Sequence, residues 1–510
     1  MPHIPWLSAT LTALLLLAGC ASAPLDYPKE VTHAIEDTSG TRHAGSVAEW
    51  LDGNTDVNGF YPLTEGFDAF GARLLLIENA EVSVDLQYFL MKSDNAGYVL
   101  AAKLLEAAER GVRVRVLLDD IFTTVTDEQL EVLNAHPNLE VRVFNPIARK
   151  GIFAFNYLGN FSLANRRMHN KALIADNQIA IVGGRNLAVE YYQLEETGEF
   201  MDFDMLSVGP IVRDVSGEFD AYWNHQLAVP LEALFVQNDT ARLEEMRSAL
   251  QQLMSEAGHS IYAEAVNTEV LNKLQQRSLS PYIADARLIV DSPQKLLEEV
   301  SDEHKTVVNE VRDAVLDAET EVIISTPYFI PREPGINTLQ KLQSQGVRVL
   351  IFTNSLSTNN HTAVHSAYSS YRKEILKAGV ELWEARADAI QVTSADGEVL
   401  PGKLTLHTKG ILIDRNRIFV GSLNLDPRSI DINTEMGLLI NSPELSSSLA
   451  EGFLQRLPTI AWQVKLEPDG NLSWHGMVDG QRVVETVEPQ TSGWQRFKAW
   501  FLQIAPESQL

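Results

Sequence analysis

The hydrophobic positions of the chain follow one plan that occurs twice, about 238 residues apart. In the first copy, the apolar run at 80–90 (AEVSVDLQYFL) predicts a buried strand. Apolar residues at helical spacing over 97–111 predict a helix that ends at Gly111, and the alternating run at 112–120 (VRVRVLLDD) predicts a second, parallel strand. Together these segments form a βαβ unit.

The second copy has the same three segments in the same order. The strand at 320–330 (TEVIISTPYFI) parallels 80–90, the helix at 336–346 ends at Gly346, and the strand at 347–355 (VRVLIFTNS) follows. Two copies of one βαβ plan predict an α/β fold with two similar lobes, each built on a mixed β-sheet flanked by helices.

The remaining pattern predicts the segments around the two lobes. Residues 20–60 contain many proline, glycine and polar breakers, so we expect an extended linker there. It leads to an N-terminal lobe at 61–230, a helical connector at 231–280 and a C-terminal lobe at 281–460. Turn signals between β-prone runs predict a small β-meander at the start of 461–510, and a helix follows it.

That last helix is amphipathic. Arg496 and Lys498 lie on one side of it. The other side carries five apolar residues at helical spacing, which are Trp494, Phe497, Trp500, Phe501 and Ile504. We expect the apolar side to dock on the protein core, and contact with a membrane surface is the alternative.

The N-terminus predicts export. Residues 1–19 include an apolar run of signal-peptide length that is too short to span a membrane, although positions 1–6 lack Lys and Arg. The run ends in LAGC at 17–20, which resembles a bacterial lipobox, and Cys20 is the only cysteine in the sequence. We expect a lipidated Cys20 and a protein anchored in the bacterial cell envelope, facing the periplasm. Ala21 favours the outer membrane, and an ordinary signal peptide is the alternative.

The composition narrows the function. Of the 510 residues, 45% are hydrophobic and 21% are charged, as in an ordinary globular protein. The 68 acidic and 41 basic residues give a formal net charge of −27, which argues against a nucleic-acid partner because phosphate binding relies on basic surface. A local basic pocket inside an acidic shell is still compatible with this charge.

The candidate chemistry lies in a short pattern that both lobes contain. The first lobe has MHNKALIADNQIAIVGGRN at 168–186, and the second has LHTKGILIDRNRIFVGSLN at 406–424. At equal spacing both provide a histidine, a lysine, an aspartate and an asparagine, which are His169, Lys171, Asp176 and Asn186, and His407, Lys409, Asp414 and Asn424. Two such stretches in register indicate a shared function.

If both stretches are strands, the histidine and the lysine share one face, and turns are expected at Asp176-Asn177 and at 414–416. Gly184 and Ser422, at matching positions, bring the backbone close to a ligand, and the asparagine returns near the His-Lys pair. An imidazole, an ammonium and an amide suit one phosphate group. We therefore expect Asn186, Asn424, Gly184 and Ser422 to contribute to phosphate binding.

Two imidazoles that face each other can catalyse phosphoryl transfer without a metal. One histidine attacks phosphorus and forms a covalent intermediate, and the other protonates the leaving alcohol and then activates the acceptor. Each needs an orienting acceptor, for which Glu435 and its first-lobe counterpart Asp202 are the candidates, with Asp204 as second choice. Metal binding is the rival chemistry. We expect no metal and no cofactor, since lysine is a poor ligand and neither pair has a third histidine or a cysteine nearby.

Both stretches match the H-x-K-x4-D-x6-G-[GS]-x-N signature, and on them the chain resembles the phospholipase D superfamily. The repeat covers roughly residues 60–460. Blocks such as LNAHPNLEVRVFNP at 133–146 and DFDMLSVGPIVRDVSGEFDAYWN at 202–224 look most like the bacterial cardiolipin synthases. The resemblance implies two lobes related by a pseudo-twofold axis, with the active site at their seam.

The resemblance also implies roles for the motif residues. His169 would be the nucleophile and His407 the general acid and base, although nothing in the sequence itself breaks the symmetry between them. Asp176 and Asp414 belong to the catalytic signature, while their opposite face parity favours a structural role.

The implied activity is that of a phosphatidyltransferase. It would make cardiolipin from phosphatidylglycerol and a second phospholipid such as phosphatidylethanolamine, through a phosphohistidine intermediate, while the lipid anchor holds it at the membrane. Hydrolysis of phospholipids to phosphatidic acid is the alternative, and a nucleic-acid phosphodiesterase or a non-catalytic envelope lipoprotein are less favoured readings. We expect Arg166 and Arg167 at solvated surface, with contact to a second lipid headgroup as the alternative.

Overall fold

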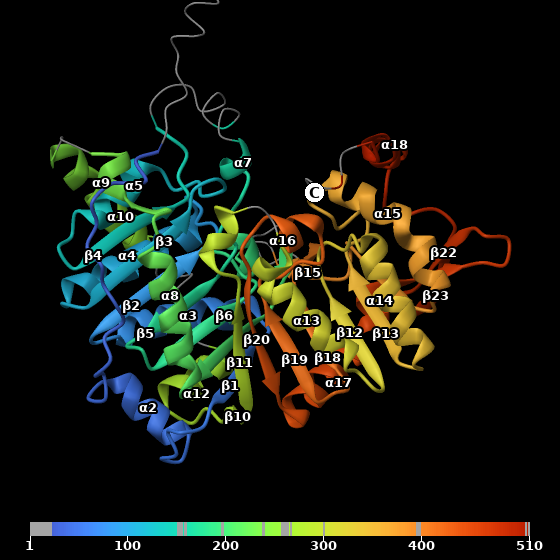
Figure 1. Ribbon diagram of the computed structural model, residues 1–510, viewed down its shortest axis with the longest axis horizontal. Helices are drawn as coiled ribbons and strands as arrows, with labels where there is room; N and C mark the ends of the chain where they lie inside the picture. Colours follow the sequence, from blue (N-terminus) through green and yellow to red (C-terminus); the bar gives the residue numbers. More distant parts are fainter. Residues whose placement is uncertain are drawn as a thin grey trace, which may run out of the picture.

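A computed structural model describes the chain over residues 23–149, 157, 161–194, 198–236, 240–256, 265, 268–298, 301–393, 399–504 and 507. Two α/β lobes lie side by side, and each contains one large mixed sheet flanked by helices (Figure 1). The N-terminal half of the chain forms one lobe and the C-terminal half forms the other. The fold class predicted from the repeated pattern is therefore confirmed.

The first lobe contains a nine-stranded sheet in the order β10-β1-β8-β6-β5-β2-β3-β4-β9. Its strands are β1 (Gly59–Leu63), β2 (Ser83–Tyr88), β3 (Arg113–Asp119), β4 (Leu139–Phe144), β5 (Ala172–Ala175), β6 (Ile179–Gly183), β8 (Asp204–Val208), β9 (Ala228–Pro230) and β10 (Tyr282–Ile283). Strands β2, β3 and β4 are parallel, and the other neighbours are antiparallel. The predicted βαβ unit is β2 and β3 with α4 (Asn95–Glu109) as crossover.

The second lobe contains a ten-stranded sheet in the order β11-β20-β19-β18-β12-β13-β14-β21-β22-β23. Its strands are β11 (Asp285–Val290), β12 (Glu321–Ser325), β13 (Arg348–Thr353), β14 (Glu381–Ala385), β18 (Gly410–Ile413), β19 (Arg417–Gly421), β20 (Met436–Asn441), β21 (Ala461–Leu466), β22 (Leu472–Val478) and β23 (Gln481–Glu485). Strands β12, β13 and β14 are parallel. The predicted meander is β21 to β23, and it extends this sheet at its edge.

Buried apolar residues form three clusters. The first lies beneath α3 (Gly66–Asn79), α4 and α5 (Asp127–Asn134) of the first lobe. Another lies beneath α13 (Thr306–Leu316), α14 (Arg332–Ser344) and α15 (Thr362–Lys377) of the second lobe. The middle cluster joins residues of both sheets with residues of α8 (Ile211–Trp223) and α17 (Pro443–Ile460). The seam between the lobes is thus a packed core that fixes their relative position.

The other elements connect or cover the lobes. They are α2 (Arg42–Trp50), α7 (Phe161–Ala164), α9 (Leu231–Leu234), α10 (Thr240–Glu256), α12 (Glu269–Gln275), α16 (Pro427–Asp431), α18 (Gly493–Leu502), the 3₁₀ helices Val189–Tyr191, Pro293–Leu296 and Asp302–His304, and the ribbon of β15 (Gln391–Thr393) and β16 (Val399–Pro401). Helices α9, α10 and α12 lie in the segment predicted as a connector.

The segment at 20–60 differs from the predicted extended linker. Its described part contains the helix α2, which Thr41 caps at its N-terminus, and its residues pack on the first lobe. Nζ of Lys29 donates to the carbonyl of Ala228 at 2.6 Å, for example. The segment is rich in polar breakers, but it also contains a short apolar face. Residues of this face, such as Val47 and Trp50, are buried in the core of the first lobe.

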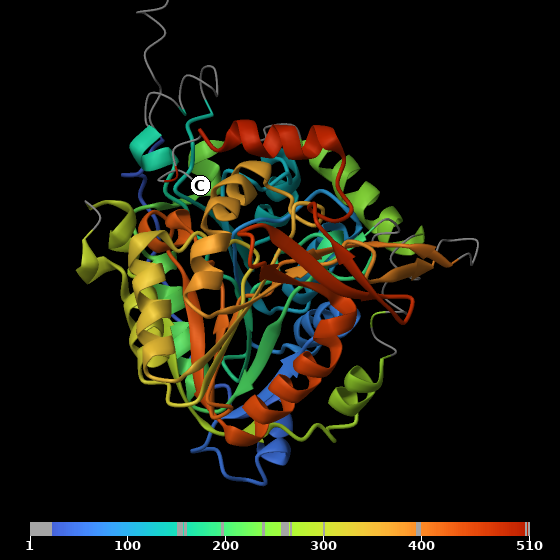
Figure 2. The ribbon, with the colours of Figure 1, turned by 90° about the vertical axis from the view of Figure 1, so that its right-hand side faces the viewer.

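The tail helix α18 also differs from its prediction. It lies on the outside of α15, at the top of the molecule (Figure 2). Trp494 is 70% exposed and Trp500 is 65% exposed, so the expected docking of the apolar side on the core is wrong. The helix packs on α15 through its narrow opposite side, where Ala499 is buried.

The predicted signal peptide at 1–19 and the predicted lipidation of Cys20 lie outside the described residues. Across the part of the chain that the structure describes, every helix is too short or too polar to cross a membrane.

Candidate active site at the seam between the lobes

The two motif stretches fold as matching hairpins, one in each lobe. Strands β5 and β6 are joined by a turn at Asp176 and Asn177, and β18 and β19 by a turn at Asp414 and Arg415. These four residues have φ angles of 50°, 51°, 53° and 51°. Residues in this left-handed conformation occupy the two central positions of a tight β-turn, which the backbone N–H of Gln178 closes on the carbonyl of Ala175 and that of Asn416 closes on the carbonyl of Ile413, both at 3.0 Å. The turns predicted to begin at each aspartate are therefore confirmed.

Asp176 and Asp414 lie at the turn end of these hairpins, and the histidines precede the other end. The carboxylate of Asp176 accepts hydrogen bonds from the backbone N–H groups of 81–83, and that of Asp414 accepts them from 319–321. Each aspartate thereby holds the start of the neighbouring strand. Their prediction as catalytic residues is corrected to a structural role, as their face parity favoured.

The same contacts determine the register of the internal repeat. Residues 81–83 and 319–321 occupy equivalent positions, 238 residues apart. The segment 80–90 therefore corresponds to 318–328, and its alignment with 320–330 is two residues out of register. The amino-acid sequences of the two strands can be aligned at an offset of 238 or of 240 residues. The hydrogen bonds from the two aspartates match at the offset of 238.

His169 is oriented by a carboxylate of the opposite lobe. Met168 forms a parallel bridge with Thr434, and the backbone N–H of His169 donates to the carbonyl of Thr434 at 3.0 Å. This places the next residue, Glu435, beside the ring, with carboxylate oxygens 2.8 and 3.1 Å from Nδ1 of His169. Because Nδ1 faces this acceptor, Nε2 remains the reactive nitrogen.

His407 has the same arrangement with the lobes exchanged. Strand β7 (Gly198–Met201) of the first lobe pairs in parallel with β17 (Lys403–Leu406) of the second, and the backbone N–H of His407 donates to the carbonyl of Met201 at 2.8 Å. The next residue, Asp202, places a carboxylate oxygen 2.6 Å from Nδ1 of His407. The two couples thus obey the pseudo-twofold relation of the lobes.

The carboxylates are therefore crossed between the lobes. Sequence reasoning named Glu435 and Asp202 as orienting acceptors but left open which histidine each one serves. The structure pairs each with the histidine of the other lobe. The second choice, Asp204, lies instead in a buried ion-pair cluster, 2.8 Å from Arg73 and 3.3 Å from Arg185.

Lys171 and Lys409 are buried beside the two couples. Nζ of Lys171 donates to the carbonyl of His169 at 2.6 Å, and Nζ of Lys409 donates to the carbonyl of His407. Lys409 also lies 2.7 Å from Nδ1 and 3.2 Å from Nε2 of His407. Lys171 lies instead over the ring of Phe89, 5.5 Å from its centroid. The two lysines therefore meet their histidines differently.

Burial sets the charge of the histidines. It lowers the pKa of His169 to about 4, although Glu435 opposes the shift. It lowers the pKa of His407 to about 3, with a further lowering by Lys409 against the effect of Asp202. Burial raises the pKa of Glu435 and of Asp202, but their cationic neighbours bring both below their ordinary values. At neutral pH both imidazoles are thus neutral, and each has a carboxylate behind it.

Burial acts on the lysines in the same direction. It lowers the pKa of Lys171 to about 7 and that of Lys409 to about 8, because desolvation disfavours the ammonium form. The nearby carboxylates Glu435 and Asp202 limit both shifts. A phosphodiester anion that enters the seam would add a negative charge and favour the protonated form of both lysines.

The asparagines of the motif have unused hydrogen-bonding groups. Nδ2 of Asn186 donates to the hydroxyl of Tyr191 at 2.9 Å, and the Tyr191 ring lies edge-on to His407, with centroids 5.0 Å apart. Phe200 stacks on the same imidazole at 5.5 Å. The side-chain oxygens of Asn186 and Asn424 are buried and, within the described residues, without a hydrogen-bond partner. Such groups are rare in folded proteins and indicate capacity for a ligand.

Ser422 and Gly184 lie against the orienting carboxylates, a placement that sequence reasoning missed. Ser422 donates its hydroxyl to Glu435 and accepts the N–H of Met436 at 3.0 Å. A Cβ at Gly184 would lie 2.2 Å from a carboxylate oxygen of Asp202, so the glycine permits the close approach of that side chain. Both positions thus accommodate or support an orienting carboxylate, and their contribution to phosphate binding stays a prediction.

A line of aromatic rings reaches from the surface to His169, and sequence reasoning missed it as well. Phe89 follows β2 directly and lies edge-on to His169, with ring centroids 4.8 Å apart. Phe122, which is half exposed, lies 5.4 Å from Phe89. The available signal was that both rings follow the carboxyl ends of parallel strands, where ligands bind in open α/β sheets.

Arg166 and Arg167 do not form the expected solvated surface. Arg167 is fully buried and lies 3.1 Å from Asp119, which also accepts the backbone N–H of Met168 at 2.9 Å. Arg166 donates across the seam to the carbonyl of Lys295 at 3.3 Å. These contacts anchor the segment that precedes His169, so the two arginines act on the position of the histidine.

The arrangement suits phosphoryl transfer. Two neutral imidazoles with carboxylate-backed Nδ1 atoms provide a nucleophile and a proton carrier, and two lysines provide charge for a phosphate. The residues of the two couples and both lysines lie at the seam, whereas the two aspartates of the signature lie at the turn ends of the hairpins. Within the described ranges, no group of three or more His, Cys, Asp or Glu side chains is placed to hold a metal ion.

Known proteins are similar to this chain over most of its length. A family model described as cardiolipin synthase, PLD-like domain, matches residues 74–223 and 311–457, one match in each lobe. Cardiolipin synthase C of Escherichia coli (strain K12) is 34% identical over 88% of this chain and 95% of its own. An uncharacterized protein of Helicobacter pylori (strain ATCC 700392 / 26695) is 30% identical over 96% of this chain and 97% of its own.

A solved structure has a similar fold. The crystal structure of phosphatidylserine synthase from Haemophilus influenzae Rd KW20 matches with a TM-score of 0.54 at 15% sequence identity. The match covers 84% of this chain and 91% of that one, so it includes both lobes.

Proposed function

The chain belongs to the phospholipase D superfamily as a cardiolipin synthase-like phosphatidyltransferase with two PLD-like domains, and on this premise we propose that it makes cardiolipin. The acceptor would be the hydroxyl of phosphatidylglycerol. The donor would be a second phospholipid, either phosphatidylglycerol or phosphatidylethanolamine. The similarity to cardiolipin synthase C over nearly the whole of both chains supports this choice of product.

The observation that carries the proposal is the pair of crossed histidine–carboxylate couples. Nδ1 of His169 lies 2.8 Å from Glu435, and Nδ1 of His407 lies 2.6 Å from Asp202. Each couple holds one ring through its Nδ1 and so directs Nε2 away from the carboxylate, an arrangement that a double displacement at phosphorus requires twice. A protein that kept this fold for binding alone would have no need to orient two imidazoles in this way.

In the proposed reaction His169 is the nucleophile, as the resemblance to two-lobed family members implies. Its Nε2 attacks phosphorus of the donor, the bond from phosphorus to the headgroup oxygen breaks, and His407 gives that oxygen a proton. The hydroxyl of the acceptor then returns a proton to His407 while its oxygen attacks phosphorus, and the phosphorus–nitrogen bond breaks. Lys171 and Lys409 would balance the charge on the non-bridging oxygens.

His407 must carry a proton when the headgroup leaves. Burial and the neighbouring Lys409 lower its pKa to about 3. A phosphodiester anion would attract the Lys409 ammonium, which now contacts the ring, and would itself favour the imidazolium form. The proton on His407 would therefore be taken up together with the substrate.

We also propose that Cys20 carries a lipid anchor and that the enzyme faces the periplasm from the bacterial envelope. The LAGC ending of the apolar run at 17–20 supports this placement. Mass spectrometry of the N-terminal peptide would reveal a lipidated cysteine, and membrane fractionation would distinguish the outer from the inner membrane. A mature protein that begins at another residue would contradict the anchor.

The function is tested with lipids in mixed micelles. Phosphatidylglycerol alone, phosphatidylethanolamine alone and the two together are incubated with the chain from Ala21 onward, and products are identified by mass spectrometry. We expect cardiolipin from the native enzyme and from a His475→Ala control in β22, and none from His169→Ala. Phosphatidic acid in place of cardiolipin would make the protein a hydrolase. Undiminished cardiolipin from His169→Ala would contradict the assigned site.

A further inference from the structure

Helix α18 and the turn that follows it present a stripe of large apolar side chains to solvent. The stripe consists of Trp494, Phe497, Trp500, Phe501 and Ile504, which are between 50% and 78% exposed. The rings pack on one another, with centroids 5.6 Å apart for Trp494 and Phe497 and 5.9 Å for Phe497 and Trp500. An exposed aromatic patch of this size is typical of a surface that binds another protein or a membrane.

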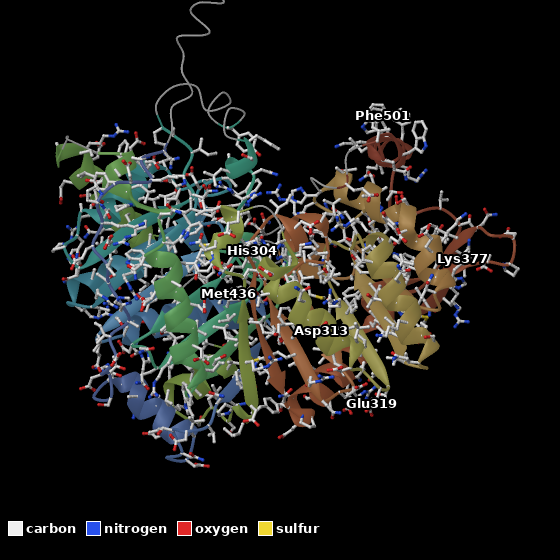
Figure 3. The ribbon with its side chains drawn as sticks, in the orientation of Figure 1. His304, Asp313, Glu319, Lys377, Met436 and Phe501 are labelled. Carbon is white, nitrogen blue, oxygen red and sulfur yellow. The ribbon has the colours of Figure 1, made fainter. Side chains whose placement is uncertain are left out.

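The helix is held firmly on the protein, so the stripe has a fixed direction. Ser492 and Gln495 form a capping box at its N-terminus. Nε2 of Gln503 donates to the hydroxyl of Ser369 on α15 at 3.3 Å, and Ala499 is buried beneath the helix. Figure 3 shows the ring of Phe501 pointing away from the body of the molecule.

The stripe lies at the end of the molecule toward which the active-site strands lead. Strand β12 begins beside Glu319, which Figure 3 labels at the end opposite to Phe501. At the far end of that strand, Ser325 pairs with Gly410, three residues after His407. Helix α7, which carries the half-exposed Phe161, also lies at this end (Figure 1).

The charge of helix α18 itself is opposite in sign to that of the whole chain. Helix α18 carries Arg496 and Lys498 and no carboxylate, whereas the formal net charge of the chain is −27. Aromatic residues flanked by basic ones suit the boundary of a bilayer with anionic headgroups. A second copy of the chain in a twofold contact would instead bring the basic residues of one helix against those of the other.

We propose that α18 docks on the surface of a lipid bilayer that contains anionic headgroups, and that docking turns the strand ends carrying the two histidines toward the lipids. This inference rests on the proposed function, because the bilayer is then the source of both substrates. The aromatic stripe inserts at the headgroup level, and Arg496 and Lys498 lie near the lipid phosphates.

Vesicle binding tests the proposal. The chain from Ala21, which keeps every described residue and lacks the N-terminal apolar run, is used with His169→Ala so that the lipids are not consumed. It is sedimented with phosphatidylcholine vesicles that contain or lack phosphatidylglycerol. We expect Trp500→Ser with Phe501→Ser to weaken binding by at least about tenfold, since two large apolar groups no longer leave water.

Matched variants separate this effect from a general loss of exposed apolar surface. Val484→Ser with Val487→Ser removes two half-exposed apolar residues outside α18 and is expected to leave vesicle binding unchanged. Lys498→Glu is expected to weaken binding to vesicles with phosphatidylglycerol, and Lys465→Glu in β21 is not. Equal binding by the Trp500→Ser, Phe501→Ser protein and its parent would overturn the proposal, provided that both melt at the same temperature.

Two further measurements distinguish the possible failures. Activity on a short-chain phosphatidylglycerol dissolved as monomers requires the active site but no bilayer. Activity on the monomeric lipid without vesicle binding would overturn the docking surface and leave the proposed function standing. Vesicle binding without activity on the monomeric lipid would overturn the proposed function alone. If light scattering showed a dimer that Trp500→Ser and Phe501→Ser dissociate, and vesicles did not bind, the stripe would be a contact between copies.

Discussion

The His169–Glu435 couple and the His407–Asp202 couple occupy equivalent positions in the two lobes, yet they are built differently. Glu435 is the longer acid, and the hydroxyl of Ser422 supports it. Asp202 is shorter, and Gly184 occupies the position equivalent to Ser422, where a Cβ would collide with the carboxylate. The longer side chain thus lies beside a serine and the shorter one beside a glycine. Both carboxylates consequently lie 2.6 to 2.8 Å from Nδ1 of a histidine.

The two motif lysines also have different contacts in the two lobes. Lys409 contacts the ring of His407. Lys171 lies over Phe89, and its hydrogen bond goes to the backbone carbonyl of His169. The repeated motif is symmetric, but its surroundings are not. Differences between the two histidines therefore have to be sought in residues around the motif, where the two lobes have diverged.

The largest effect separates the two histidines. His169→Ala removes the proposed nucleophile, so we expect kcat to fall by about 10⁴-fold or more with every donor. In His407→Ala, a phosphodiester with a nitrophenolate leaving group departs without a proton, so it will still react with His169. A burst of nitrophenolate and a phosphohistidine peptide in the mass spectrum measure this step. The same burst from His169→Ala would assign the nucleophile to His407.

The carboxylates provide the next comparison. Glu435→Gln and Asp202→Asn keep the size of each side chain, but an amide can donate to Nδ1 and hold the wrong tautomer, so we expect kcat to fall about 10³-fold in each. Steady-state kinetics on one donor lipid measures the two falls side by side. Unequal falls would show that the couples contribute unequally, and an unchanged kcat in either variant would remove that acid from the mechanism.

Exchanging the residues at positions 184 and 422, which lie beside the two carboxylates, is expected to lower kcat by smaller and unequal factors. Gly184→Ser places a Cβ about where the Asp202 carboxylate now lies, and such a displacement costs about 10²-fold in kcat. Ser422→Gly removes one hydrogen bond to Glu435 and costs about tenfold, since a hydrogen bond to a charged group contributes roughly 1.5–3 kcal/mol. Kinetics of both variants, with melting temperatures as a control for folding, measure the ratio. Equal losses would contradict the difference in packing.

The smallest effect concerns the lysines and pH. Below their pKa values of about 7 and about 8, Lys171 and Lys409 carry charge that binds an anionic donor, and above them the charge is lost. We therefore expect kcat/KM to fall as pH rises through this range, by no more than about tenfold per pH unit for each lysine. Lys171→Arg keeps its charge at high pH, so its profile will retain only the fall near 8. A profile identical to that of the native enzyme would contradict this assignment.

Much of the fold could be predicted because its pattern is local. The alternating run at 112–120 became β3 (Arg113–Asp119), and the helix predicted before it ends in the residues before Gly111. The histidines and lysines of the site followed from the duplicated spacing, which places each pair on one face of a strand. Asp176 could be recognised as structural by the same parity argument.

The crossed couples could not be predicted in this way. Glu435 is 266 residues from His169, and Asp202 is 205 residues from His407. They meet because short segments of the two lobes pair with each other, and no periodic pattern along the chain reports such an exchange. The support of Asp202 by Gly184 depends on a close approach in three dimensions. For α18, the amphipathic pattern predicted an apolar side of the helix, but it could not predict whether that side faces the protein core or solvent.

The exchange of carboxylates has a consequence for biosynthesis. The ribosome completes the first lobe, with His169 and Asp202, before Glu435 and His407 exist, so neither catalytic couple can form on a nascent chain. Both appear together when the second lobe docks. The enzyme is thereby inactive while it is being synthesised, and it first becomes competent when both lobes have folded and docked.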